Sequence, residues 1–83
     1  RSRAPPIALL TLCLSVPESR IAALLTEATE KFTGVSIGSY PRFDDAGYQV
    51  LVTVESRDAS VVQACGAYLR EALGEAVIRV DPA

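Results

Sequence analysis

The hydrophobic and polar positions along the chain predict four strands and two helices. Residues 7–14 form a short apolar run without a polar face, which is typical of a strand that is central in its sheet or covered on both sides. Residues 48–55 form the clearest strand pattern in the chain, because Tyr48, Val50, Val52 and Val54 alternate with Gln49, Leu51, Thr53 and Glu55. Two shorter apolar stretches, residues 35–40 and 76–80, complete the predicted set of strands.

Helical spacing first appears after residue 14. The apolar positions follow the i, i+3, i+4, i+7, i+11 pattern of one helix face and are Ile21, Leu24, Leu25, Ala28 and Phe32. Ser15 and Glu18 have the spacing of a capping box, with Pro17 in the first turn, so we expect the helix to begin at Ser15. Gly34 is the expected stop.

A second helix is predicted from residue 59 to about residue 73. Asp58 is the expected N-cap and Gly74 the expected end of the helix. The inner positions are Val62, Cys65, Leu69 and Leu73. Gly66 costs this helix about 1 kcal/mol relative to Ala, and we expect close packing of the helix on the sheet to explain it.

The order of these elements, β-α-β-β-α-β, predicts an α+β fold of the ferredoxin-like, split βαβ type. In this fold a four-stranded antiparallel sheet has both helices on one face. Turn-forming residues at 42–47 join the second and third strands, which should form an antiparallel hairpin. We predict a single domain over residues 7–81, preceded by a proline-containing tail or linker at residues 1–6.

The sheet face opposite the helices is predicted to be unusually apolar. Leu9, Thr11 and Cys13 should point away from the helices, near Leu51 and Thr53. Such a patch usually indicates a partner surface, so we expect contact with a neighbouring domain of the same chain or with a second copy in a homodimer. Alternatively, the tail at residues 1–6 shields the first predicted strand from solvent.

Composition narrows the classes of partner. Ten acidic and eight basic residues give a net charge of -2, which provides no basic face for nucleic acid. The apolar run at residues 7–16 is too short to span a bilayer, and no signal-peptide cleavage pattern is present. We therefore expect a cytoplasmic protein without nucleic-acid or membrane partners.

Candidate chemistry is sparse. The sequence has no histidine, so a Ser/His/Asp or Cys/His set is impossible, and we predict no catalytic or metal-binding residues in this domain. Cys13 and Cys65 are expected to be buried thiols rather than a disulfide, although a disulfide remains open if both side chains meet across the core. Asp44 and Asp45 are expected to form a turn rather than bind a metal.

One stretch is more distinctive than the rest. Residues 35–41 read V-S-I-G-S-Y-P, a Tyr-x-Val strand follows at residues 48–50, and Glu-Ser-x-Asp at residues 55–58 opens a helix. This combination resembles the second, smaller part of the molybdopterin-binding-like region of eukaryotic-type FAD synthases, and CinA-like proteins have a similar segment. The resemblance covers roughly residues 17–80.

The resemblance implies a parent protein that handles adenine dinucleotides. In FAD synthases a separate PAPS-reductase-like domain is the FMN adenylyltransferase, and the molybdopterin-binding-like region is linked to hydrolysis of the pyrophosphate of FAD or ADP-ribose with a divalent metal. That nucleotide and metal site lies in a larger, Rossmann-like part. The resemblance therefore implies an accessory domain that is not catalytic alone, has no cofactor of its own and docks on the hydrolase lobe.

The residues expected to face that lobe or its nucleotide are Gly38, Ser39, Tyr40, Pro41 and Arg42. Arg42 and Phe43 could hold a phosphate or a base, or Phe43 could simply anchor the hairpin beside a solvated Arg42. The alternative to an FAD synthase-like or CinA-like domain is a ligand-sensing or dimerisation module of the ACT kind, which has the same strand order.

Overall fold

The computed structural model describes residues 7–42 and 47–82. Its elements are β1 (Ala8–Leu14), the short 3-10 helix η1 (Glu18–Arg20), α1 (Ala22–Lys31), β2 (Ser36–Pro41), β3 (Val50–Ser56), α2 (Ala59–Leu73), the 3-10 helix η2 (Gly74–Ala76) and β4 (Val77–Pro82). The predicted tail and the predicted turn residues Phe43, Asp44 and Asp45 lie outside the described residues.

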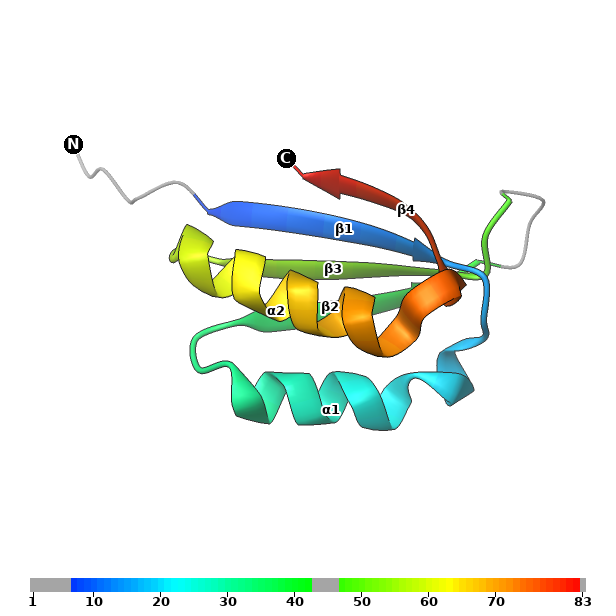
Figure 1. Cartoon of the computed structure of the whole chain (residues 1–83), viewed down its shortest axis with the longest axis horizontal. Helices are drawn as coiled ribbons and strands as arrows, with labels where there is room; N and C mark the ends of the chain where they lie inside the picture. The colour runs from blue at the N-terminus through cyan, green and yellow to red at the C-terminus, as the bar shows by residue number, and fades with distance from the viewer. Residues whose placement is uncertain (1–6, 43–46, 83) are drawn as a thin grey trace.

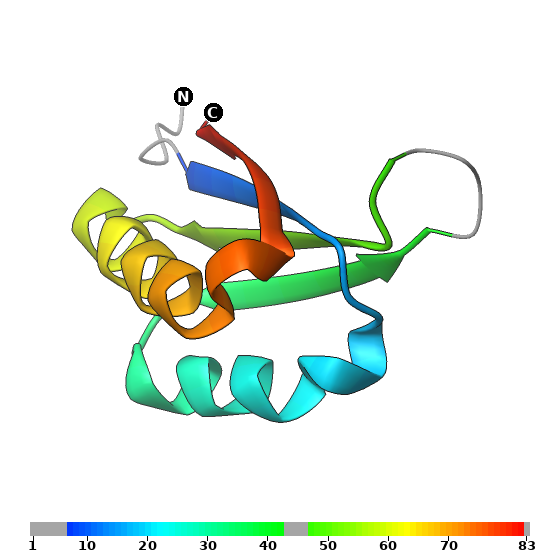
Figure 2. The ribbon, with the colours of Figure 1, turned by 45° about the vertical axis from the view of Figure 1, so that its right-hand side comes forward.

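The four strands form one sheet in the order β2-β3-β1-β4, and every neighbouring pair is antiparallel. Both helices lie on the same face of this sheet, as Figure 1 shows and as Figure 2 shows again from a second direction. β2 and β3 pair from Ser36 with Glu55 to Pro41 with Val50, which confirms the predicted hairpin. The architecture is therefore the predicted ferredoxin-like α+β fold.

The core lies between the sheet and the two helices. Alternate residues of the two central strands face the helices, and the register places Leu10, Leu12 and Leu14 opposite Val54, Val52 and Val50. The helices contribute Ile21, Leu25, Ala28, Val62, Cys65 and Leu69 to the same cluster. Full burial of one such large aliphatic side chain contributes about 1.5–3 kcal/mol, so this cluster is the main stabilising feature of the fold.

The limits of α2 agree with the prediction because they depend on local chemistry. The Asp58 side chain accepts a hydrogen bond from the Ser60 N–H, which satisfies one of the free donors at the helix start. Gly74 ends the helix with φ 56°, a conformation that glycine adopts without a steric penalty. Gly66 lies against β1: a Cβ atom at this position would stand 2.3 Å from Leu10 Cδ2, which confirms the expected close packing.

The predicted start of α1 is wrong. Ser15 and Glu18 form no capping box, and α1 begins at Ala22 without a side-chain cap. Ser15 is instead held by residues next to the neighbouring strands: its N–H donates to the carbonyl of Ala76 in η2 at 2.8 Å, and its carbonyl accepts from Nε2 of Gln49, which precedes β3, at 2.9 Å. These tertiary hydrogen bonds outweigh the local capping preference.

The strand ends also shift by one or two residues. β4 continues through Asp81 and Pro82, which were predicted to be outside the strand, because they pair with Thr11 and Leu10 of β1. β3 begins at Val50 rather than residue 48. β2 ends at Pro41 on the sheet edge, where a residue without an N–H removes no hydrogen bond from the interior of the sheet.

Candidate functional site

The sheet face opposite the helices, here called the outer face, is the first candidate site. Its residues alternate with those of the core and are Leu9, Thr11 and Cys13 of β1, Ser36, Gly38 and Tyr40 of β2, Leu51, Thr53 and Glu55 of β3, and Arg79 and Asp81 of β4. Among the described elements, no helix or strand covers this face (Figure 2).

Thr11, Thr53 and Gly38 lie in the middle row of the outer face, and the apolar side chains lie in the rows on either side of it. The register aligns Arg79, Cys13, Leu51 and Tyr40 in one row across the four strands. Cys13 is almost fully buried by its neighbours, Leu51 is half-buried, and Tyr40 is 53% exposed. The face therefore has a smaller apolar area than its sequence suggests, with Tyr40 as its exposed aromatic side chain.

The predicted corner at residues 38–42 is divided between two sides of the sheet. Gly38 and Tyr40 lie on the outer face, and the Tyr40 ring lies across Gly38. A Cβ atom at Gly38 would stand 2.8 Å from the Tyr40 hydroxyl oxygen and 2.9 Å from Thr53 Oγ1. The absence of a side chain at residue 38 therefore creates the space that the tyrosine ring occupies.

Ser39 lies on the opposite side of β2. Its hydroxyl donates to the Glu18 carboxylate at 2.7 Å and so connects the edge strand to η1. Because this hydroxyl is engaged within the domain, Ser39 does not join Gly38 and Tyr40 in one contact surface. Its role in the structure is to position β2 against η1.

Pro41 and Arg42 lie at the exposed end of β2. The Arg42 N–H donates to the Gln49 carbonyl at 2.8 Å, which extends the hairpin beyond Pro41. The Arg42 guanidinium lies 5.7 Å from the centre of the Tyr48 ring, with Nη1 3.4 Å from the Tyr48 hydroxyl oxygen. Arg42 is thus placed beside an aromatic ring at the hairpin, and the sequence did not indicate Tyr48 as that ring.

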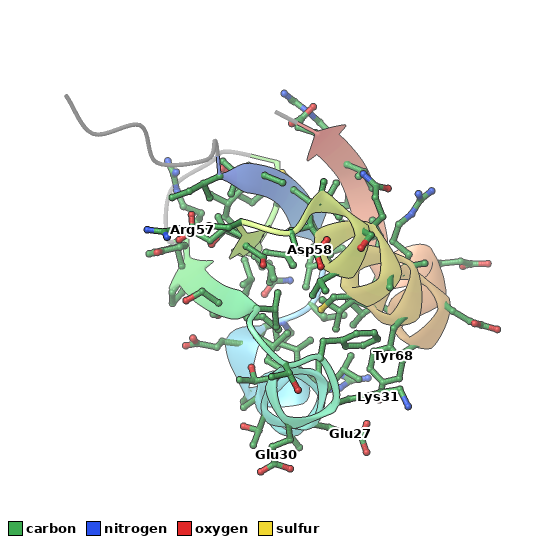
Figure 3. The ribbon with its side chains drawn as sticks, turned by 90° about the vertical axis from the view of Figure 1, so that its left-hand side faces the viewer. Glu27, Glu30, Lys31, Arg57, Asp58 and Tyr68 are labelled. Carbon is green, nitrogen blue, oxygen red and sulfur yellow. The ribbon has the colours of Figure 1, made fainter. Side chains whose placement is uncertain are left out.

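A second cluster joins the two helices and was not predicted (Figure 3). The Tyr68 hydroxyl of α2 donates to the Glu27 carboxylate of α1, and this hydrogen bond raises the pKa of Tyr68. Lys31 Nζ lies 5.6 Å from the centre of the Tyr68 ring, and the Phe32 ring meets it edge-on at 5.5 Å between centroids. These contacts fasten α1 to α2.

The two cysteines are free and lie on opposite sides of the sheet. Cys13 is on the outer face between Leu51 and Arg79, whereas Cys65 is in the core on α2, where burial raises the pKa of its thiol. The disulfide alternative is therefore excluded, since the sheet separates the two side chains. Among residues 7–42 and 47–82, no group of three or more His, Cys, Asp or Glu side chains could hold a metal ion.

Two open hollows lie away from the predicted corner. One of about 650 Å³ lies between α2 and β4 and is lined by Ala67, Arg70, Val77 and Ile78, among others. The other, of about 480 Å³, lies at the start of α2 beside Arg57 and Asp58. In the part of the chain that the structure describes, no helix is long and apolar enough to cross a membrane.

Comparison with known proteins identifies one family. Residues 6–81 match the family described as FAD synthase, middle domain. The chain is also similar in structure to a suspected monooxygenase from Shewanella loihica PV-4, with a TM-score of 0.54 and 24% sequence identity over 93% of this chain and 88% of that chain. The second likeness extends to the fold alone. A search of curated proteins found no match.

Proposed function

Because this chain belongs to the family of FAD synthase middle domains, we propose that it is an accessory domain of an FAD-synthesising enzyme and is not catalytic alone. The domain docks through its outer face on a neighbouring lobe of the same protein. The observation that supports this proposal is the outer face itself, on which Leu9, Leu51 and Tyr40 remain accessible opposite a fully formed core.

The chemistry of the outer face suits an interface between domains. Leu9, Leu51 and Tyr40 lie around the hydroxyl groups of Thr11 and Thr53, and Arg79 and Asp81 lie on the edge strand β4, a mixture of apolar and polar groups that is common in protein contact surfaces. Tyr40 lies against Gly38, so its ring is already ordered before contact. An ordered aromatic side chain loses little conformational entropy on binding.

The neighbouring lobe in this proposal is a molybdopterin-binding-like hydrolase lobe, as the resemblance to FAD synthases and CinA-like proteins implies. FAD or ADP-ribose and a divalent metal would bind in that lobe. In this arrangement Gly38 and Tyr40 contact the lobe, Ser39 fixes the strand through Glu18, and Pro41 and Arg42 lie at the rim of the contact.

Docking can be tested with the isotope-labelled chain and a separately produced hydrolase lobe. We expect chemical-shift changes at Leu9, Tyr40 and Leu51 of the outer face. Thr53→Arg places a charge in the middle of that face and should abolish these changes, whereas Thr26→Arg on the exposed surface of α1 should preserve them. Shift changes confined to the helices would contradict docking through the outer face.

The accessory role is tested by titration of the labelled chain with FAD, FMN and ADP-ribose. We expect no shift changes near Tyr40, because the nucleotide site belongs to the neighbouring lobe. Saturable changes at Gly38, Tyr40 and Arg42 would instead show that this domain binds nucleotides alone, and the proposal of a purely accessory role would then be rejected.

A further inference from the structure

The strand β4 has one free edge. It is the last strand of the sheet in the order β2-β3-β1-β4, as Figure 1 shows, and among residues 7–42 and 47–82 no segment pairs with its outer side. The backbone N–H and C=O groups on that side can pair with another strand. This edge is distinct from the outer face, since it is the side of the sheet rather than its surface.

The charges of β4 are arranged symmetrically about Val80. Arg79 precedes it and Asp81 follows it, both on the outer face, and their side chains are 68% and 48% exposed. Within one chain Arg79 Nε lies 2.8 Å from Asp81 Oδ2. When two copies of this strand run antiparallel about the central residue, the positive charge of each copy lies opposite the negative charge of the other.

That complementarity specifies one register between two copies. A two-fold axis at Val80 places Arg79 of each copy opposite Asp81 of the second copy. Two opposite-charge pairs then lie across the junction, where each contributes favourably to strand pairing. A shift of one residue in either direction removes this double match.

An exposed apolar side chain lies beside the same edge. The register of β4 with β1 shifts between Cys13 and Leu14, so that Ile78 has no partner in β1. Ile78 is 52% exposed and lines the hollow of about 650 Å³ between β4 and α2. In the register centred on Val80, the backbone of residue 82 of the second copy comes opposite Ile78.

We infer that the edge of β4 is a self-association surface, through which two copies of this chain pair antiparallel about Val80 into one continuous sheet. This inference does not rest on the proposed accessory role, because the outer face stays open in such a dimer. Pro82 has no N–H and the irregularity at Ile78 interrupts the strand, so the new pairing centres on residues 79–81. The dimer should therefore be weak and dependent on concentration.

Sedimentation velocity of the 83-residue chain up to about 1 mM tests the inference, since this range detects dissociation constants of similar size. We expect the average mass to rise toward that of a dimer. Arg79→Asp and Asp81→Arg each replace two opposite-charge pairs by two like-charge pairs, and each should weaken dimerisation about tenfold. An equimolar mixture of the two variants should regain association, because the acidic strand of one matches the basic strand of the other.

The mixture separates pairing between copies from effects within one chain, since neither variant repairs its own ion pair. Glu30→Arg on the side of α1 away from the sheet changes charge by the same amount as Asp81→Arg and should leave dimerisation unchanged (Figure 3). A mass that stays monomeric at all concentrations would overturn the inference. Unweakened single variants, a mixture that fails to associate, or loss of the dimer in Thr53→Arg would each overturn it as well.

Discussion

On the outer face, the Tyr40 ring occupies the space that a side chain at residue 38 would fill. A Cβ atom on Gly38 would stand 2.8 Å from the Tyr40 hydroxyl oxygen. The two residues follow each other at i and i+2 on one edge strand, so their side-chain positions are neighbours on the same face. The first role of the Gly-Ser-Tyr-Pro sequence is therefore structural, because the glycine allows the tyrosine ring to lie against the sheet.

Gly38→Ala should displace the Tyr40 ring from the outer face. Two of the atoms in conflict belong to the far end of the exposed Tyr40 side chain, which can rotate away, and the third is Thr53 Oγ1, which can turn to another rotamer. We therefore expect the free energy of unfolding to change by less than about 1 kcal/mol. NMR contacts between the Tyr40 ring and residue 38 should disappear, and docking of the hydrolase lobe should weaken. A loss of stability above about 3 kcal/mol, the upper end of overpacking costs, would show that the ring cannot move.

Gly66→Ala should destabilise the fold more than Gly38→Ala does, because the steric conflict at residue 66 lies in the core. The new methyl group would meet Leu10 Cδ2 at 2.3 Å, and Leu10 is only 6% exposed. Overpacking of this kind costs about 1–3 kcal/mol, which exceeds the gain of about 1 kcal/mol in helix propensity. Urea denaturation should therefore show lower stability.

The double variant Gly66→Ala/Leu10→Val provides the matched test of that cause. Valine lacks the δ carbon that the new methyl group would strike, so the loss from Gly66→Ala should be smaller in this background than in the parent. Equal losses in both backgrounds would show that the contact with Leu10 is not responsible.

The hydrogen bond between Ser39 and Glu18 should be measurable as a coupling energy. Ser39→Ala and Glu18→Ala each remove one partner of a half-buried bond to a charged group, and we expect a coupling of about 1 kcal/mol in the double-mutant cycle. Glu30→Ala combined with Ser39→Ala is the control and should be additive. Additivity in both cycles would exclude a contribution of this bond to stability.

The N-cap of α2 predicts part of the acid sensitivity of the fold. The Ser60 hydroxyl and the Ser60 N–H donate to Asp58 Oδ1 at 2.6 Å and 3.0 Å, and these hydrogen bonds lower the pKa of Asp58 in the folded state. A lowered pKa stabilises the fold above the pKa of the unfolded chain, and this stabilisation is lost as the pH falls through the folded pKa, below about 4.

Asp58→Asn keeps an oxygen that can accept these hydrogen bonds but cannot titrate. The parent should therefore lose more of its Tm than the variant between about pH 5 and pH 3. Thermal melts followed by circular dichroism at a series of pH values measure the difference. Parallel profiles for the two proteins would mean that Asp58 does not contribute to the acid response.

Local patterns were sufficient for features that depend on a few neighbouring residues. The cap at Asp58, the end of α2 at Gly74 and the alternation along β3 depend on backbone donors, backbone conformation and side-chain periodicity within one element. Such features predict the order of the strands and helices, and that order with short connections leaves few possible topologies. The ferredoxin-like fold was predictable for this reason.

Features that depend on distant residues were not predictable in the same way. Ser15 and Glu18 have a capping-box spacing, yet Glu18 accepts its hydrogen bond from Ser39, which is 21 residues away in the chain. Tyr68 and Glu27 are 41 residues apart and meet only because α1 and α2 pack side by side. A sequence pattern does not predict such side-chain contacts, because they depend on how the helices are placed on the sheet.

The amino-acid sequence by itself determined the order of the strands and helices, their approximate extent and which side of each is apolar. Only the tertiary structure decided that Arg79, Cys13, Leu51 and Tyr40 share one row, that the Tyr40 ring lies across Gly38 beside Thr53, and that β4 pairs with β1 as far as Pro82. The physical reason is the register of the sheet: it is fixed by hydrogen bonds between strands far apart in the chain, and alternation then assigns every side chain to one face or the other.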